Sequence, residues 1–134
     1  MANTRKFYLE QIRDGDIVFI NACSQCVSRA EIRFEGLDKE VVLKKENSRT
    51  ELQRLDGEFQ AVRRGHAPLS FTITITGQEP PEKKMKVTQH IFILSDKDGR
   101  EKGVNYVYNI EDVENGDEDF NDYYINVVAW HRRG

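Results

Sequence analysis

Acidic residues are concentrated in one short stretch of the sequence. Seven of the 23 Asp and Glu residues fall within residues 111–122, which contain no Lys or Arg. The rest of the chain has 20 basic residues against the other 16 acidic ones. Carboxylates this close together repel one another unless a cation lies among them. We therefore expect this stretch to hold a metal ion.

The order of the residues in this stretch favours calcium. Asp117, Asp119 and Asn121 alternate along the chain and Asp122 follows directly, so an extended backbone would bring several oxygen atoms to one side. Calcium takes roughly six to eight oxygen ligands, whereas magnesium usually keeps several waters. The loop is not an EF-hand, because Asp122 stands where that motif needs Gly and Val128 where it needs Glu. A solvated acidic hairpin without a metal is the alternative.

Short runs with a period of two dominate the remaining sequence. In residues 69–77, Phe71, Ile73 and Ile75 alternate with threonines, as in a half-buried strand. Turn signals such as Asp98-Gly99 separate the runs. Similar runs occupy residues 6–12, 16–21, 29–36, 40–45, 58–64, 86–94, 104–110 and 123–130. This pattern predicts one all-β domain over residues 1–134, an antiparallel β-sandwich of Greek-key or jelly-roll type, with the calcium loop before the last strand.

One segment departs from the alternation. Residues 45–57 contain candidate cap residues at Asn47 and Ser48, leucines at 52 and 55, and a terminating Gly57. These signals predict a short peripheral helix.

Composition excludes several classes of protein. The net charge of −3 and pI of about 5.7 argue against a nucleic-acid partner, which would need a basic surface. Hydrophobic residues make up 38% of the chain, and no apolar run is long enough for a membrane span. The first residues lack the apolar core of a secretory signal, so we expect a cytoplasmic protein or one exported by a non-classical route.

The residues that most often serve in catalysis form no catalytic pattern. Cys23 and Cys26 form a CxxC without the second ligand pair of a zinc site, and the strand-like run after it does not fit a redox motif. His66, His90 and His131 show no triad spacing with either cysteine. We expect no enzyme. Aromatic residues near the acidic stretch could stack on sugars but are more often core; they are Tyr106, Tyr108, Tyr123, Tyr124 and Trp130.

The acidic stretch and its flanks resemble a known family. Glu111-Asp112, then Gly116-Asp117-Glu118-Asp119-Phe120-Asn121-Asp122, then a β run with Trp130 and Gly134, is similar to the end of the two-calcium bacterial fucose- and mannose-binding lectins of the LecB type. An early run that ends at Asn21 resembles the same family's first ligand strand. The resemblance implies carbohydrate partners and two bound calcium ions.

The resemblance also assigns the ligands. Glu111, Asp117, Asp119 and Asp122 would hold one calcium, and Asn21, Asp119, Asn121 and Asp122 the other. Residues 113–116 are longer than in the family, so Glu114 is a rival to Glu111. Asp112 and Asp117 would hydrogen-bond the sugar. The terminal carboxylate of Gly134 would reach the calcium site of a neighbouring subunit, which implies a homodimer or higher homo-oligomer.

Specificity would come from the tripeptide Ala22-Cys23-Ser24, which follows Asn21. In the resembling family, Ala at the first of these positions accompanies a preference for mannose over fucose. The alternative function is a calcium-stabilised adhesion or structural module that binds no sugar.

Overall fold

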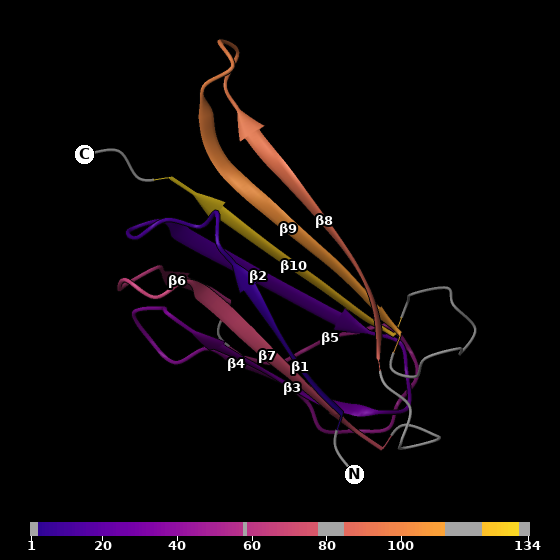
Figure 1. Ribbon diagram of the computed structural model, residues 1–134. Helices are drawn as coiled ribbons and strands as arrows, with labels where there is room; N and C mark the ends of the chain where they lie inside the picture. Colours follow the sequence, from indigo (N-terminus) through magenta and orange to yellow (C-terminus); the bar gives the residue numbers. More distant parts are fainter. Residues whose placement is uncertain (1–2, 58, 78–84, 112–121, 132–134) are drawn as a thin grey trace.

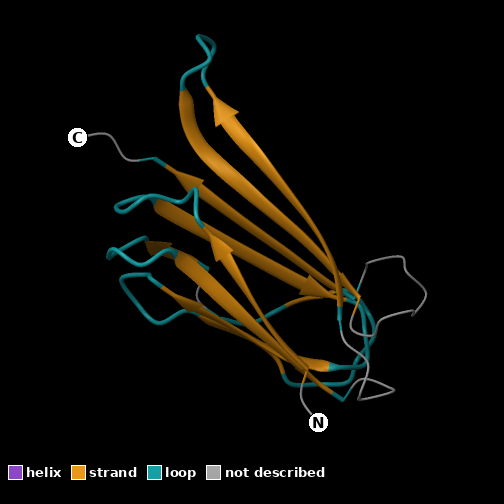
Figure 2. Cartoon of the chain, in the orientation of Figure 1, coloured by secondary structure: helices purple, strands orange, loops and turns teal. Residues whose placement is uncertain are grey.

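The computed structural model describes residues 3–57, 59–77, 85–111 and 122–131. These residues form ten β-strands and no helix (Figures 1 and 2). The strands are β1 (Asn3–Leu9), β2 (Ile17–Ser24), β3 (Arg29–Glu35), β4 (Val42–Lys45), β5 (Gln53–Arg54), β6 (Gln60–Val62), β7 (Leu69–Thr76), β8 (Lys86–Ser95), β9 (Glu101–Glu111) and β10 (Tyr123–Trp130). Within these ranges, no helix exists that could cross a membrane.

The strands form two antiparallel sheets that face each other. One sheet has the order β1-β7-β3-β4. The other has the order β5-β2-β10-β9-β8, and β6 also pairs with β2. The last strand, β10, therefore lies between β2 and β9 in the middle of the six-stranded sheet (Figure 1). The all-β sandwich expected from the sequence is confirmed.

Alternation places the core as the sequence predicts. In β7, Phe71, Ile73 and Ile75 are fully buried, whereas the threonines between them are only partly buried. The buried side chains of both sheets interlock between the layers, as in other sandwiches. Phe71 is central, because its ring lies 5.0 to 5.2 Å from the rings of Phe7, Phe34 and Tyr108. Burial raises the pKa of Tyr108 well above its ordinary value.

The helix predicted over residues 45–57 does not form, so that prediction was wrong. The backbone of this segment pairs with neighbouring strands instead: Leu55 N donates to Ala22 O at 2.8 Å, and Lys44 N donates to Asp56 O at 2.9 Å. Leu55 is buried but Leu52 is 62% exposed. The two leucines therefore do not share an apolar face, and the tertiary hydrogen bonds override the local helix signals.

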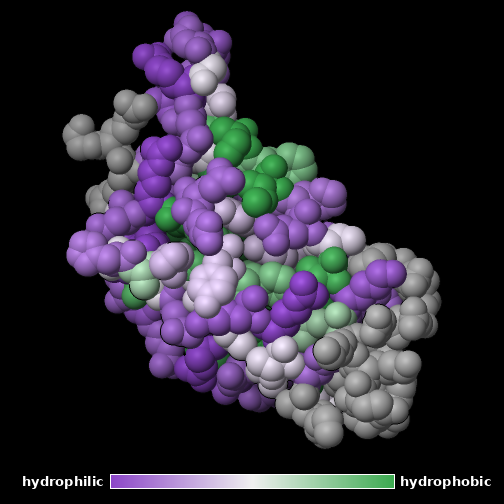
Figure 3. All heavy atoms as spheres, in the orientation of Figure 1, coloured by the Kyte–Doolittle hydropathy of each residue, from purple (hydrophilic) through white to green (hydrophobic). Residues whose placement is uncertain are grey.

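The middle of β8, residues 89–93, is exposed on both faces of the sheet, which alternation does not predict. Ile91 and Ile93 pair with Tyr106 and Val104, so they lie on the core side of the sheet, yet they are 40% and 46% exposed. The β8–β9 hairpin projects beyond the four-stranded sheet, which cannot cover it (Figure 1). Hydrophobic atoms reach the surface below the tip of this hairpin (Figure 3).

Candidate functional site

The acidic stretch joins β9 to its neighbour β10, the strand in the middle of the six-stranded sheet. The strand β9 ends at Glu111 and β10 begins at Tyr123, with Ile110 directly opposite Tyr123. The stretch is thus the connection of an antiparallel hairpin. Five of the predicted site residues and the rival Glu114 lie outside the described residues; the five are Asp112, Asp117, Asp119, Asn121 and Gly134. Of the predicted calcium ligands, Asn21, Glu111 and Asp122 lie among the described residues.

Glu111 lies at the entry of the connection and is only 2% exposed. It stands opposite Lys86 in the ladder between β8 and β9. A carboxylate is costly to bury unless a hydrogen bond, an ion pair or a metal compensates for lost water. This burial suits Glu111 for the role that the resemblance assigns to it.

Asp122 lies at the exit and is held through its backbone. Its carbonyl accepts a hydrogen bond from Gln25 N at 3.1 Å and from the Cys26 thiol at 3.5 Å. Cys26 is buried and Cys23 is partly exposed, and both are free thiols. Within the described structure, Cys26 therefore anchors the exit of the acidic stretch.

A buried tyrosine strengthens the same anchor. The Tyr123 hydroxyl lies 2.9 Å from the Ser28 hydroxyl and donates to Ser28 O at 3.2 Å. The Ser28 hydroxyl also lies 3.2 Å from Cys26 Sγ. Tyr123 is fully buried, as are Tyr106 and Tyr108, so these three aromatics belong to the core. This polar cluster fixes β10 relative to the turn after β2.

The early ligand strand does not bring Asn21 to Asp122. Asn21 is exposed and lies directly opposite Asn126, whereas Ser24 lies opposite Tyr123. Asn21 is therefore about four residues, or roughly 13 Å, from the Asp122 end of the ladder. A calcium ion shared by Asn21 and Asp122 would require residues 112–121 to extend along this face.

Two members of the predicted specificity tripeptide point into the core. Ala22 is 2% exposed and Ser24 is fully buried, while Cys23 faces the other side of the sheet. The Ser24 hydroxyl is buried and has no hydrogen-bond partner among the described residues. Ala22 can therefore touch a ligand on the outer face only through its backbone, and its carbonyl already accepts from Leu55 N.

Oxygen ligands are the right chemistry for calcium at this end of the sheet. Glu111 and Asp122 offer carboxylates at the two ends of the connection, and calcium prefers such hard oxygens. Among the described residues, no three His, Cys, Asp or Glu side chains come together in a way that could hold a metal. Any calcium site therefore depends on the acidic residues of the connection itself.

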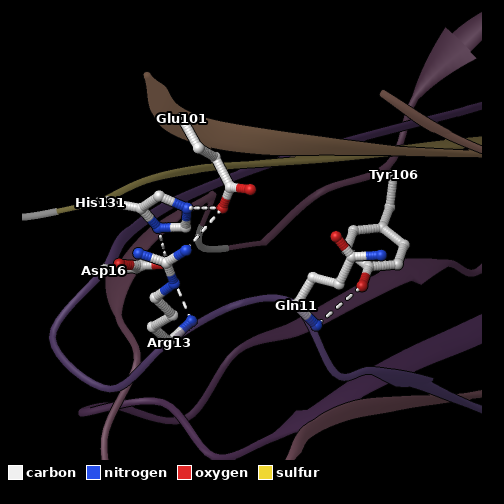
Figure 4. Close-up of polar contacts among 6 residues, drawn as sticks. All are labelled: Gln11, Arg13, Asp16, Glu101, Tyr106 and His131. Carbon is white, nitrogen blue, oxygen red and sulfur yellow. Dashed lines mark hydrogen bonds and ion pairs between the residues drawn. The ribbon is translucent and has the colours of Figure 1, made fainter. Parts of the chain in front are cut away.

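The structure contains a second polar cluster that the sequence analysis did not predict. Figure 4 shows His131, just after β10, between Asp16 and Glu101. His131 Nδ1 lies 2.9 Å from Asp16 Oδ2, and His131 Nε2 lies 2.6 Å from Glu101 Oε2. Arg13 contacts both carboxylates, because its N donates to Asp16 at 2.8 Å and its guanidinium pairs with Glu101 at 2.8 Å.

This cluster is structural. The side chains of His131 and Asp16 are only 6% and 2% exposed. Neither cysteine takes part, so the cluster offers no nucleophile for a cysteine–histidine pair. Its three segments are far apart in sequence, so no local pattern reveals it.

Comparison with known proteins gives structural matches but no sequence match. No protein-family model matches the chain, and no curated protein does. The fold is similar to that of the Chromobacterium violaceum lectin CV2L, solved in complex with alpha-methyl-fucoside: the TM-score is 0.61, with 12% identity over 96% of each chain. It is also similar to the C-terminal domain of the BC2L-C lectin from Burkholderia cenocepacia, with a TM-score of 0.59 and 14% identity over 99% of this chain and 100% of that one. The chain therefore has the β-sandwich fold found in these bacterial lectins.

Proposed function

We propose that the protein is a lectin that binds carbohydrate through calcium held by residues 111–122. The observation that carries this proposal is the position of the acidic stretch in the chain, between the paired strands β9 and β10 of a β-sandwich similar to those of bacterial lectins. Buried Glu111 and anchored Asp122 support it at the two ends. Bound calcium would supply a Lewis-acidic centre for two neighbouring sugar hydroxyls.

The proposed ligands are the set that the family resemblance implies. Asp119 is the residue to test first, because it would contact both calcium ions. We expect Asp119→Asn to abolish stabilisation by calcium, whereas Glu40→Gln removes a carboxylate that is 79% exposed and should leave it intact. The measurement is the melting temperature with calcium and with chelator. A calcium concentration about 100 times the Kd would stabilise the native state by about 2.7 kcal/mol. An Asp119→Asn variant that calcium still stabilises fully would contradict the assigned role.

Sugar preference is a separate part of the proposal. The sequence resemblance favours mannose, whereas one structural neighbour was solved with a fucoside. Buried Ala22 offers no side-chain atom to the outer face, so the mannose preference would have to come through the backbone. Competition between methyl mannoside and methyl fucoside decides the preference, and an unchanged ratio in Ala22→Ser would remove this position from the site.

A calcium-stabilised module without sugar binding is the second candidate. The separation of Asn21 from Asp122 along the ladder favours it, because a calcium ion shared by these two residues would require residues 112–121 to extend along this face. Such a module would gain stability from calcium yet bind neither sugar.

Self-association is also proposed. Gly134 lies outside the described residues, but β8 supplies an exposed edge with Ile91, Phe92 and Ile93 at its surface. Exposed edge strands are available for pairing with another chain. Sedimentation equilibrium tests this: a monomer at high concentration would contradict the homodimer.

A further inference from the structure

The outer face of the six-stranded sheet contains a pocket that shares a single residue, Asn21, with the proposed calcium ligands. Its volume is about 400 Å³. Its floor comes from β2 and β10, which lie side by side in the middle of the sheet (Figure 1). The lining residues that matter here are Phe19, Asn21, Arg54, Phe59, Asn126 and Val128.

Two apolar side chains and two amide side chains form the floor of the pocket. Phe19 lies directly opposite Val128, and two residues further along, Asn21 lies directly opposite Asn126. Residues two apart on a strand share a face, so these four side chains form a square on the outer surface. Phe19 is 38% exposed. The floor thus offers an aromatic surface beside two amides.

Arg54 of β5 and Phe59, which precedes β6, form the side wall of the pocket. The short strands β5 and β6 both pair with β2, and the segment between them passes the pocket. Ile20 N donates to Phe59 O at 2.7 Å, which fixes that segment against β2. The Arg54 guanidinium lies over the Phe59 ring, 5.0 Å from its centroid. Stacking holds the guanidinium in place while its N–H groups stay available for hydrogen bonds.

The polar side chains of the pocket make no hydrogen bond or ion pair with the described residues. The amides of Asn21 and Asn126 make no hydrogen bond there, and Arg54 makes no ion pair there. Arg54 is also the single charged residue among the described residues that line the pocket. A positive pocket on a protein of net charge −3 is suited to an anionic ligand.

We propose that this pocket binds an acidic pyranose, such as a hexuronic acid residue of a glycan, without calcium. The apolar face of the sugar ring would pack on Phe19 and Val128. The amides of Asn21 and Asn126 can both donate to and accept from ring hydroxyls. The sugar carboxylate would pair with the Arg54 guanidinium in a charge-assisted hydrogen bond. This pocket shares only Asn21 with the proposed calcium ligands, and its contacts through Phe19, Arg54, Asn126 and Val128 need no calcium.

The test is an NMR titration of the whole chain with methyl glucuronide in excess chelator. We expect amide shifts on β2 and β10 at Phe19, Asn21 and Asn126. Methyl glucoside, which lacks the carboxylate, should bind at least about tenfold more weakly than methyl glucuronide. Arg54→Met should weaken glucuronide binding by at least the same factor. Arg64→Met is the matched control, because Arg64 is exposed, lies outside the pocket and gives the same change in charge.

A second variant guards against indirect effects of Arg54→Met on the Phe59 wall. Asn126→Ala removes an exposed amide without touching that wall, and it should also weaken binding. The proposal is overturned if wild type does not bind glucuronide in chelator, if glucoside binds equally well, or if Arg54→Met binds like Arg64→Met. Failure of the calcium lectin proposal would appear separately, as loss of methyl fucoside binding in calcium while glucuronide binding in chelator persists.

Discussion

Removing the imidazole of His131 should destabilise the fold measurably. His131→Ala deletes two contacts of 2.9 and 2.6 Å to Asp16 and Glu101. Asp16 is buried, and among the described residues its carboxylate would keep only the Arg13 backbone donor, so it loses part of its compensation for desolvation. A buried polar group left unsatisfied costs about 1 to 3 kcal/mol, and a charged group lies toward the upper end.

We therefore expect a loss of about 2 to 3 kcal/mol, or about 6 to 12 °C in melting temperature for a chain of this length. Urea unfolding followed by circular dichroism measures the free energy directly. His66→Ala is the control, because His66 is exposed in a loop and should change stability by less than about 0.5 kcal/mol.

A double-mutant cycle with Asp16→Asn separates the contact from general damage. The effects of Asp16→Asn and His131→Ala should not be additive, because the two residues share one contact. Equal stabilities of His131→Ala and His66→Ala would refute the structural role of this cluster.

Phe71→Ala should lower the free energy of unfolding by about 3 to 5 kcal/mol, measured by urea unfolding, because its ring is fully buried against three others. The Arg100 backbone N–H donates to the Asp96 carboxylate and holds the pKa of Asp96 below its ordinary value of 3.8. Ionised Asp96 therefore stabilises the β8–β9 turn fully above pH 3.8, and this stabilisation is lost as the pH falls through the lowered pKa. An NMR titration of the Asp96 carboxyl with a midpoint at the ordinary value would contradict this. Tyr123→Phe removes the buried contact to Ser28 and should cost about 1 kcal/mol, read from the thermal midpoint.

The strands could be predicted because alternation is a local signal. Phe71, Ile73 and Ile75 face the core as their spacing indicates. Exposure of β8 could not be predicted, because it depends on how far the opposite sheet extends. The helix prediction failed at Leu55 because its backbone bonds to β2, which the local sequence does not reveal.

The site was predictable only in part. Charge density located the connection between β9 and β10, and the structure places buried Glu111 at its entry. The strand register was not predictable, so neither the pairing of Asn21 with Asn126 nor the burial of Ala22 could be foreseen. The same register created the aromatic and amide pocket, whose residues come from β2, β5, β10 and the segment before β6.

Calorimetric titration of the intact protein with methyl fucoside and methyl mannoside tests the central claim most directly. Each titration is run in calcium, after chelation, and after calcium is restored. We expect one or both sugars to bind in calcium, to lose all measurable heat on chelation, and to bind again when calcium returns. Binding that persists in chelator would contradict a calcium-bridged site, and no binding of either sugar in calcium would contradict the lectin function.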